Sequence, residues 1–221
     1  MKIKIHHVTK TIKDNMILDD INLEMESGNI YGFVGINGSG KTMLMRMIAG
    51  LIRPTEGTVS VDGKELHKDI SFPPDMGLII EKPELLGHLN GLENLKLLAG
   101  IKKKVTEGQM KGFLEQFGLD PNDKRPLRKY SLGMKQKIGI IQAIMEDPQL
   151  LIMDEPFNAL DEGTVEMLRN LFIEYKQQGK LIIMTSHHSE DIELLCDETV
   201  YMQDGKIKKK TLKDVEIQRD A

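Results

Sequence analysis

Eight consecutive residues follow the pattern G-x-x-x-x-G-K-S/T and have the most specific chemistry in the chain. They are Gly35, Ile36, Asn37, Gly38, Ser39, Gly40, Lys41 and Thr42. The glycines let backbone N–H groups turn inward around an anion, and a helix that begins here adds its positive N-terminal dipole. The lysine ammonium would reach the β- and γ-phosphates of a nucleoside triphosphate, and the threonine hydroxyl would bind Mg²⁺. This phosphate loop, residues 35–42, therefore predicts a site for ATP and Mg²⁺.

Two carboxylates, Asp154 and Glu155, directly follow the apolar residues 150–153. So apolar a run is typical of a strand inside a parallel sheet, and ligands bind at the carboxyl ends of such strands. Two adjacent acids beside a triphosphate would repel it unless a cation lay between them. We therefore expect Asp154 to join the Mg²⁺ shell and Glu155 to polarise the attacking water, which predicts ATP hydrolysis.

A second pattern that can contact an anion occupies residues 130–136. Ser131 is suited to cap the start of a helix, and methionine and isoleucine residues recur after it at helical spacing. A serine hydroxyl, the backbone of Gly133 and a helix N-terminus can together contact a phosphate. Residues 130–136 have two possible interpretations. They are either only a capped helix, or a second contact for a phosphate that another segment binds.

The elements around these groups predict an α/β fold with a mainly parallel sheet. Residues 30–34 form a buried strand that enters the phosphate loop, and residues 42–49 form the helix that leaves it. Two further apolar runs, residues 150–153 and 180–184, are joined by a helix at 162–178, the pattern of parallel strands with a crossover.

The remaining segments predict two additions to this sheet. Alternating residues at 2–8 and 17–25 indicate an antiparallel β subdomain at the N-terminus. Helical patterns at 92–99, 106–117 and 131–145 indicate a helical subdomain inserted at about residues 83–147. From Lys206 onward we expect a last hairpin and a polar surface tail.

Composition excludes several classes of protein. The chain has 221 residues, which suits one domain, and its net charge of -4 argues against a nucleic-acid partner. Its single cysteine, Cys196, lies beside leucines, so we expect a core residue and a reducing compartment. No apolar stretch approaches the ~20 residues of a membrane-spanning helix, so another chain would have to supply any span.

With these segments together, the chain resembles the ABC transporter ATPase family over nearly its whole length. In that family two copies pair head to tail, and each ATP lies between the phosphate loop of one copy and the signature motif, usually L-S-G-G-Q, of the other. Residues 130–134 read Y-S-L-G-M here and keep the serine and the second glycine. The resemblance thus implies that Ser131 and Gly133 contact the γ-phosphate held by a second copy. The run is similar to the variant of bacitracin- and lantibiotic-type exporters.

The resemblance implies roles for two more residues. Asp161, at the end of the run Asn158-Ala159-Leu160-Asp161, matches the D-loop that crosses the dimer interface. His187 matches the histidine that hydrogen-bonds the γ-phosphate, and its position just past a strand favours it over its neighbour His188.

Two positions depart from the family pattern. Glu81 stands where the family has a glutamine that binds Mg²⁺, so it is either a Mg²⁺ ligand or an ordinary loop carboxylate. Ile12 stands where the family stacks adenine on an aromatic ring, and residues 9–18 contain no aromatic residue. Because stacking is worth ~0.5–1.5 kcal/mol, we expect weaker nucleotide binding and less discrimination between purines.

As a whole, the resemblance implies a single ABC-type ATPase domain, residues 1–221, with a P-loop NTPase core. It implies an ATPase subunit at the cytoplasmic face of the membrane that powers export, of peptide antibiotics or similar amphipathic compounds, through separate transmembrane permease subunits. Residues 83–99 lie where the family docks a helix of such a subunit. The alternatives are a soluble ABC-type ATPase of DNA repair or translation, and a P-loop switch or small-molecule kinase. The last would need neither the Ser131–Gly133 motif nor His187.

Overall fold

A central sheet of six strands organises residues 1–213, the part of the chain that the computed structural model describes. The strand order is β10 (Lys206–Leu212), β9 (Glu198–Gln203), β3 (Ile30–Val34), β8 (Leu181–Thr185), β7 (Leu150–Met153) and β6 (Met76–Ile79). All neighbours are parallel except β10, which forms an antiparallel hairpin with β9. The parallel strands therefore end at one shared edge. The expected hairpin is present, and the expected tail falls on residues 214–221, outside the described part.

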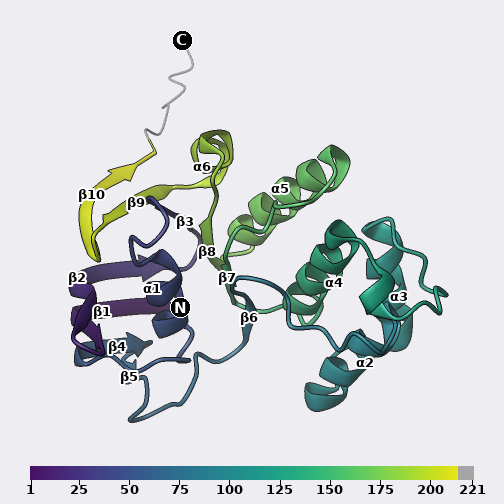
Figure 1. Ribbon diagram of the computed structural model, residues 1–221, viewed down its shortest axis with the longest axis horizontal. Helices are drawn as coiled ribbons and strands as arrows, with labels where there is room; N and C mark the ends of the chain where they lie inside the picture. The colour runs from purple at the N-terminus through teal and green to yellow at the C-terminus, as the bar shows by residue number, and fades with distance from the viewer. Residues whose placement is uncertain (214–221) are drawn as a thin grey trace.

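An antiparallel sheet of four strands packs beside this core, in the order β2 (Asn15–Glu26), β1 (Lys2–Ile12), β4 (Glu56–Val61) and β5 (Lys64–Glu65). Helix α1 (Lys41–Ile48) lies with it against one face of the central sheet, as Figure 1 shows. The central sheet is covered on both faces, so alternate residues of β7 point into two different cores. Leu150 and Ile152 join the core shared with α1, whereas Leu151 and Met153 join the core on the opposite face.

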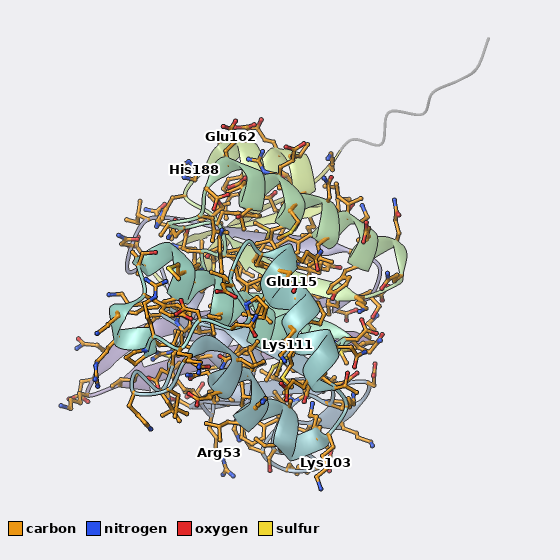
Figure 2. All side chains as sticks on the ribbon, turned by 90° about the vertical axis from the view of Figure 1, so that its right-hand side faces the viewer. Arg53, Lys103, Lys111, Glu115, Glu162 and His188 are labelled. Atoms are coloured by element: carbon orange, nitrogen blue, oxygen red, sulfur yellow. The ribbon has the colours of Figure 1, made fainter. Side chains whose placement is uncertain are left out.

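The segment between β6 and β7 is helical and lies at the far end of the molecule from the antiparallel sheet (Figure 1). It contains α2 (Gly91–Lys102), α3 (Glu107–Gln116), a 3-10 turn (Leu127–Lys129) and α4 (Leu132–Ile144). Capping boxes begin two of these helices: Asn90 pairs with Glu93 at α2, and Thr106 with Gln109 at α3. The outer face of α3 carries Lys111 and Glu115, which Figure 2 shows on the side turned to the viewer.

Helix α5 (Glu162–Gln177) joins β7 to β8, and α6 (Ser189–Leu195) follows β8. Both cover the face of the sheet opposite α1, with Leu168 and Phe172 of α5 buried there. Cys196 is buried as expected, and burial raises the pKa of its thiol to about 12. No helix in residues 1–213 combines the length and the apolar character needed to cross a membrane.

These elements confirm the predicted fold class, a mainly parallel α/β core with an N-terminal antiparallel sheet and inserted helices. Strands β6 and β9 and helix α6 were not predicted. The two strands lie one on each side of the predicted parallel strands. Helix α6 follows the loop of residues 186–188, which comes after β8 and contains His187.

Candidate nucleotide-binding and catalytic site

The phosphate loop connects the end of β3 to the first residue of α1. Gly40 precedes the helix with a φ of 103°, in the left-handed region that glycine tolerates. A Cβ atom at Gly40 would lie 2.9 Å from a methyl carbon of Leu18 and 3.2 Å from the carbonyl oxygen of Ile17. Glycine is thus required for the turn itself and for the contact of the loop with β2.

The side chain of Lys41 folds back and hydrogen-bonds to the backbone of the phosphate loop. Its Nζ donates hydrogen bonds to the carbonyl oxygens of Gly35, at 2.7 Å, and Ile36, at 3.1 Å. The side chain is almost fully buried, so a cationic group is held at the loop. The buried hydroxyl of Ser39 has no hydrogen-bond partner among the described residues. An unpaired buried donor next to a held cation fits a loop that binds an anion.

Three hydroxyl and carboxylate groups from different elements meet at the edge of the sheet. Asp154 follows β7 and is buried; its Oδ2 accepts a hydrogen bond of 2.9 Å from Thr42 Oγ1, on α1. Its Oδ1 accepts a bond of 2.7 Å from Thr185 Oγ1, the last residue of β8. The structure therefore brings together the predicted Mg²⁺ ligands Thr42 and Asp154. Thr185, which sequence reasoning missed, fixes the carboxylate's orientation.

The donor set at this point suits Mg²⁺. Hydroxyl and carboxylate oxygens are the ligands that this ion prefers, together with water and phosphate oxygens. Residues 1–213 contain no group of three or more histidine, cysteine, aspartate or glutamate side chains that could hold a metal by themselves. Thr42 and Asp154 can thus supply only part of a shell that a bound triphosphate and water would complete.

Glu155 and His187 face each other beside this cluster. The backbone N–H of His187 donates to Glu155 Oε2 at 3.1 Å, and His187 Nε2 lies 3.3 Å from Glu155 Oε1. Burial raises the pKa of Glu155; the nearby Asp154 raises it further, while the charge and N–H of His187 lower it. His188 instead donates its backbone N–H to Ser186 Oγ at 3.1 Å, and Figure 2 shows it near the edge of the molecule. The structure thus brings the predicted catalytic residues Glu155 and His187 together.

Glu81 lies just past the end of β6 and points to a partner that was not predicted. Its Oε1 accepts a hydrogen bond of 2.8 Å from the guanidinium of Arg46, and its side chain is 61% exposed. Arg46 stands four residues after Thr42 on α1, so it shares a helix face with the Mg²⁺ ligand, a signal that the sequence contains. In this structure Glu81 contacts Arg46 rather than Thr42 or Asp154, and a role in binding Mg²⁺ stays a prediction.

Ile12 closes β1 at the tip of the β1–β2 hairpin. It is 40% exposed, and Met16, the second residue of the return strand, is 58% exposed. Because β2 packs against the phosphate loop through Ile17 and Leu18, this aliphatic tip lies at the same side of the loop. It presents apolar surface without a ring on which a base could stack.

Ser131 and Gly133 are placed by α4, away from the phosphate loop of their own chain. Ser131 caps the helix, its Oγ accepting a hydrogen bond of 3.2 Å from Met134 N. A Cβ atom at Gly133 would lie 2.4 Å from the carbonyl oxygen of Ala159. The start of α4 thus packs directly on residues 158–161.

Two residues that the sequence analysis missed strengthen this contact. Gln136, a buried polar residue of α4, donates through Nε2 to the carbonyl oxygens of Pro156, at 3.2 Å, and Glu155, at 3.4 Å. Lys137 Nζ lies 2.7 Å from Asp161 Oδ2, while Asp161 Oδ1 caps α5. The Lys137 ammonium, followed by the Thr164 donors, holds the pKa of Asp161 well below its usual range. A buried glutamine within an apolar helix was the signal available in the sequence.

Comparison with known proteins places this geometry in a family. The family model described as ABC transporter matches residues 18–158. An uncharacterized ABC transporter ATP-binding protein of Bacillus subtilis, YybJ, is 45% identical over 93% of this chain and 94% of its own length. The lantibiotic transport ATP-binding protein SrtF of Streptococcus pyogenes is 34% identical over 93% of this chain and 88% of its own. The bacitracin transport ATP-binding protein BcrA of Enterococcus faecalis is 37% identical over 92% of this chain and 67% of its own.

Solved structures agree with the fold. An ATP-binding subunit of an ABC transporter superposes with a TM-score of 0.86 at 27% identity, covering 96% of this chain and 90% of that one. The ATP-binding cassette MJ0796, solved as a dimer bound to ADP and Pi, has a TM-score of 0.84 at 23% identity. It covers 95% of this chain and 98% of that one, and at this identity it shows the fold alone.

Proposed function

The chain belongs to the ABC transporter family of ATP-binding proteins, and from this premise we propose that it is the ATP-hydrolysing subunit of an exporter. The observation that carries the proposal is the hydrogen bond from Thr42 to Asp154, which joins the phosphate loop to the carboxylates after β7. The exported compounds are proposed to be peptide antibiotics or similar amphipathic molecules. The printed names of the lantibiotic and bacitracin relatives support that class.

The residues of this chain divide the chemistry between them. Lys41 and the N–H groups of residues 35–42 bind the phosphates, while Thr42 and Asp154 would hold Mg²⁺. Bound Mg²⁺ would neutralise charge on the β- and γ-phosphates. Glu155 takes a proton from the attacking water, for which its raised pKa suits it better than an ordinary glutamate. His187 orients Glu155 and donates toward the γ-phosphate.

The site needs a second copy of the chain to close over ATP. Ser131, Gly133 and Asp161 lie on the surface formed by α4 and residues 158–161, where they can approach the phosphate loop of a partner in a head-to-tail pair. A two-fold symmetric dimer then contains two composite sites. The dimeric state of the cassette with the same fold supports this arrangement.

The membrane subunits are proposed to be separate chains that dock at the cytoplasmic face of the membrane. We take residues 1–221 as one ATPase domain, with residues 83–147 as its helical subdomain. A hollow of about 860 Å³ lies where that subdomain meets α1 and β6. Its lining includes Arg46, Glu81, Pro83 and Gln142, which gives a docking helix both apolar and charged contacts. Co-purification with a membrane protein tests the transporter assignment.

Replacement of the proposed base tests the ATPase mechanism. Glu155→Gln keeps the shape of the side chain but cannot accept the proton, so we expect hydrolysis to fall to background while ATP still binds. The variant should then accumulate as an ATP-bound dimer, measured by size-exclusion chromatography with and without ATP and Mg²⁺. Glu115→Gln, on the exposed face of α3 in Figure 2, is the matched control and should hydrolyse ATP at the wild-type rate. Undiminished hydrolysis in Glu155→Gln would refute the assignment of the base.

A further inference from the structure

A buried carboxylate, Asp191, lies behind the loop that carries His187. It belongs to α6 and is 1% exposed. Its Oδ1 accepts hydrogen bonds from two nitrogens of Arg169, Nε at 3.0 Å and a terminal nitrogen at 2.5 Å. Arg169 belongs to α5, and its side chain is largely buried. It also makes a longer contact of 3.7 Å with the exposed Glu190. Both bonds go to the same oxygen, so the charged guanidinium holds Oδ1 and leaves Oδ2 for another partner.

The second oxygen of Asp191 is bonded to the loop of residues 186–188, which contains His187. Asp191 Oδ2 accepts a hydrogen bond of 2.8 Å from Ser186 Oγ, and Ser186 Oγ accepts one of 3.1 Å from the backbone N–H of His188. Ser186 and His188 flank His187, so the hydroxyl ties both sides of that residue to a buried anion. His187 then holds Glu155 through its backbone N–H and its ring.

These bonds form a continuous series from α5 to the proposed base: Arg169, Asp191, Ser186, the His187 loop and Glu155. A buried ion pair alone is weak evidence for stability, because desolvation of both charges offsets their attraction. Here Oδ2 of Asp191 is bonded to the loop of His187 rather than to Arg169. The ion pair between α5 and α6 would form without this second bond, so the bond points to a role in the loop.

We propose that Arg169 and Asp191 act through Ser186 as positioning residues that fix His187 against Glu155. The proposal rests on the proposed ATPase function and names residues that lie behind the loop of His187 and reach Glu155 only through that loop. Loss of the series frees His187 to rotate, so the chemical step slows while ATP, bound mainly by the phosphate loop, still binds.

The chain offers a matched control for a purely structural role. Lys176, near the end of α5, forms an ion pair with Asp197, which follows α6. This pair also joins α5 to the segment around α6, but it contacts no residue of the His187 loop. Lys176→Met therefore removes an ion pair between the same parts of the fold without touching the series.

The test measures kcat and KM for ATP in the full-length chain. Ser186→Ala and Asp191→Asn should each lower kcat by about tenfold or more, comparable to the effect of removing an outer partner that orients a metal ligand. KM should change less than kcat. Ser186→Thr, which keeps the hydroxyl, should restore activity, and Lys176→Met should hydrolyse ATP like the wild type. In a His187→Ala background, which removes the ring contact but keeps the backbone N–H of residue 187, Ser186→Ala should cause a smaller loss than it causes in the wild type.

Three results would overturn the proposal: wild-type kcat in Ser186→Ala, an equal loss in Lys176→Met, or losses that multiply in the His187→Ala background. Ser186→Ala removes only one surface-loop oxygen, so it keeps the test decisive where Asp191→Asn fails to fold. If the wild-type chain hydrolyses no ATP, the proposed function itself fails. If it hydrolyses ATP and these variants match it, only the positioning role fails.

Discussion

Among single residues, Ile12 departs most from the chemistry expected of an adenine site. It offers an exposed aliphatic side chain at the tip of the β1–β2 hairpin, with Met16 on the return strand. Ile12→Tyr should supply a ring for the base and tighten ATP binding by about two- to tenfold, from a stacking energy of ~0.5–1.5 kcal/mol. Isothermal titration with ATP and with tripolyphosphate checks this. Affinity for tripolyphosphate, which has no base, should not change, and unchanged affinity for ATP contradicts the adenine role.

The raised pKa of Glu155 predicts a pH dependence. Because burial favours the protonated carboxyl, Glu155 ionises at a higher pH than an ordinary glutamate and acts as a base only above that pKa. The acid limb of kcat/KM, which reports the free enzyme, should therefore lie above the pH at which exposed glutamates titrate. The charge of His187 lowers this pKa, so His187→Gln should move the limb to higher pH. A limb that moves to lower pH would contradict the arrangement.

At the scale of elements, the contact between α4 and residues 158–161 depends on Gly133. An added methyl would lie 2.4 Å from the backbone oxygen of Ala159, and neither backbone can yield without a shift. Gly133→Ala should destabilise the chain by about 1–3 kcal/mol, as overpacking does, and abolish ATP hydrolysis. Thermal unfolding and ATPase assays measure both effects.

A glycine in α3 provides the opposite case. A Cβ atom at Gly112 would meet nothing within 4 Å, and the residue lies inside the helix. Gly112→Ala should therefore stabilise the chain by about 0.4–1 kcal/mol through lower entropy of the unfolded state, with ATP hydrolysis unchanged. If Gly112→Ala also destabilised the chain, replacing a glycine within a helix would be enough to explain the loss of stability in Gly133→Ala. The contact of Gly133 with Ala159 would then not be needed as the cause.

Local pattern predicted the elements that contain a motif or a strong periodicity. The strand before the phosphate loop, the helix after it and the apolar strand before Asp154 all appear where their residues indicated. The partners between elements were not predictable in this way. Gln136 reaches the backbone of Pro156, and Thr185 reaches Asp154, across segments whose approach is set by the packed sheet. The short α6 and strand β9 carry too few periodic residues to stand out from a loop.

At the scale of the whole molecule, the proposed head-to-tail pair predicts complementation. A Lys41→Ala chain has a defective phosphate loop and an intact Ser131, whereas a Ser131→Arg chain has the reverse. Each alone should hydrolyse almost no ATP, but a mixed dimer contains one site built entirely from intact parts. Mixing the two purified variants should thus restore partial activity, measured as phosphate release. Activity that stays at the sum of the separate chains contradicts the composite site.

The close approach of Gly133 to Ala159 also separates two kinds of constraint within residues 131–133. A Cβ atom at Gly133 would meet a backbone oxygen of the same chain, so packing inside the chain requires glycine there. Leu132 is 63% exposed, so packing inside the chain leaves room for its side chain. Its fit would instead be decided by the surface of a second copy in the proposed head-to-tail pair.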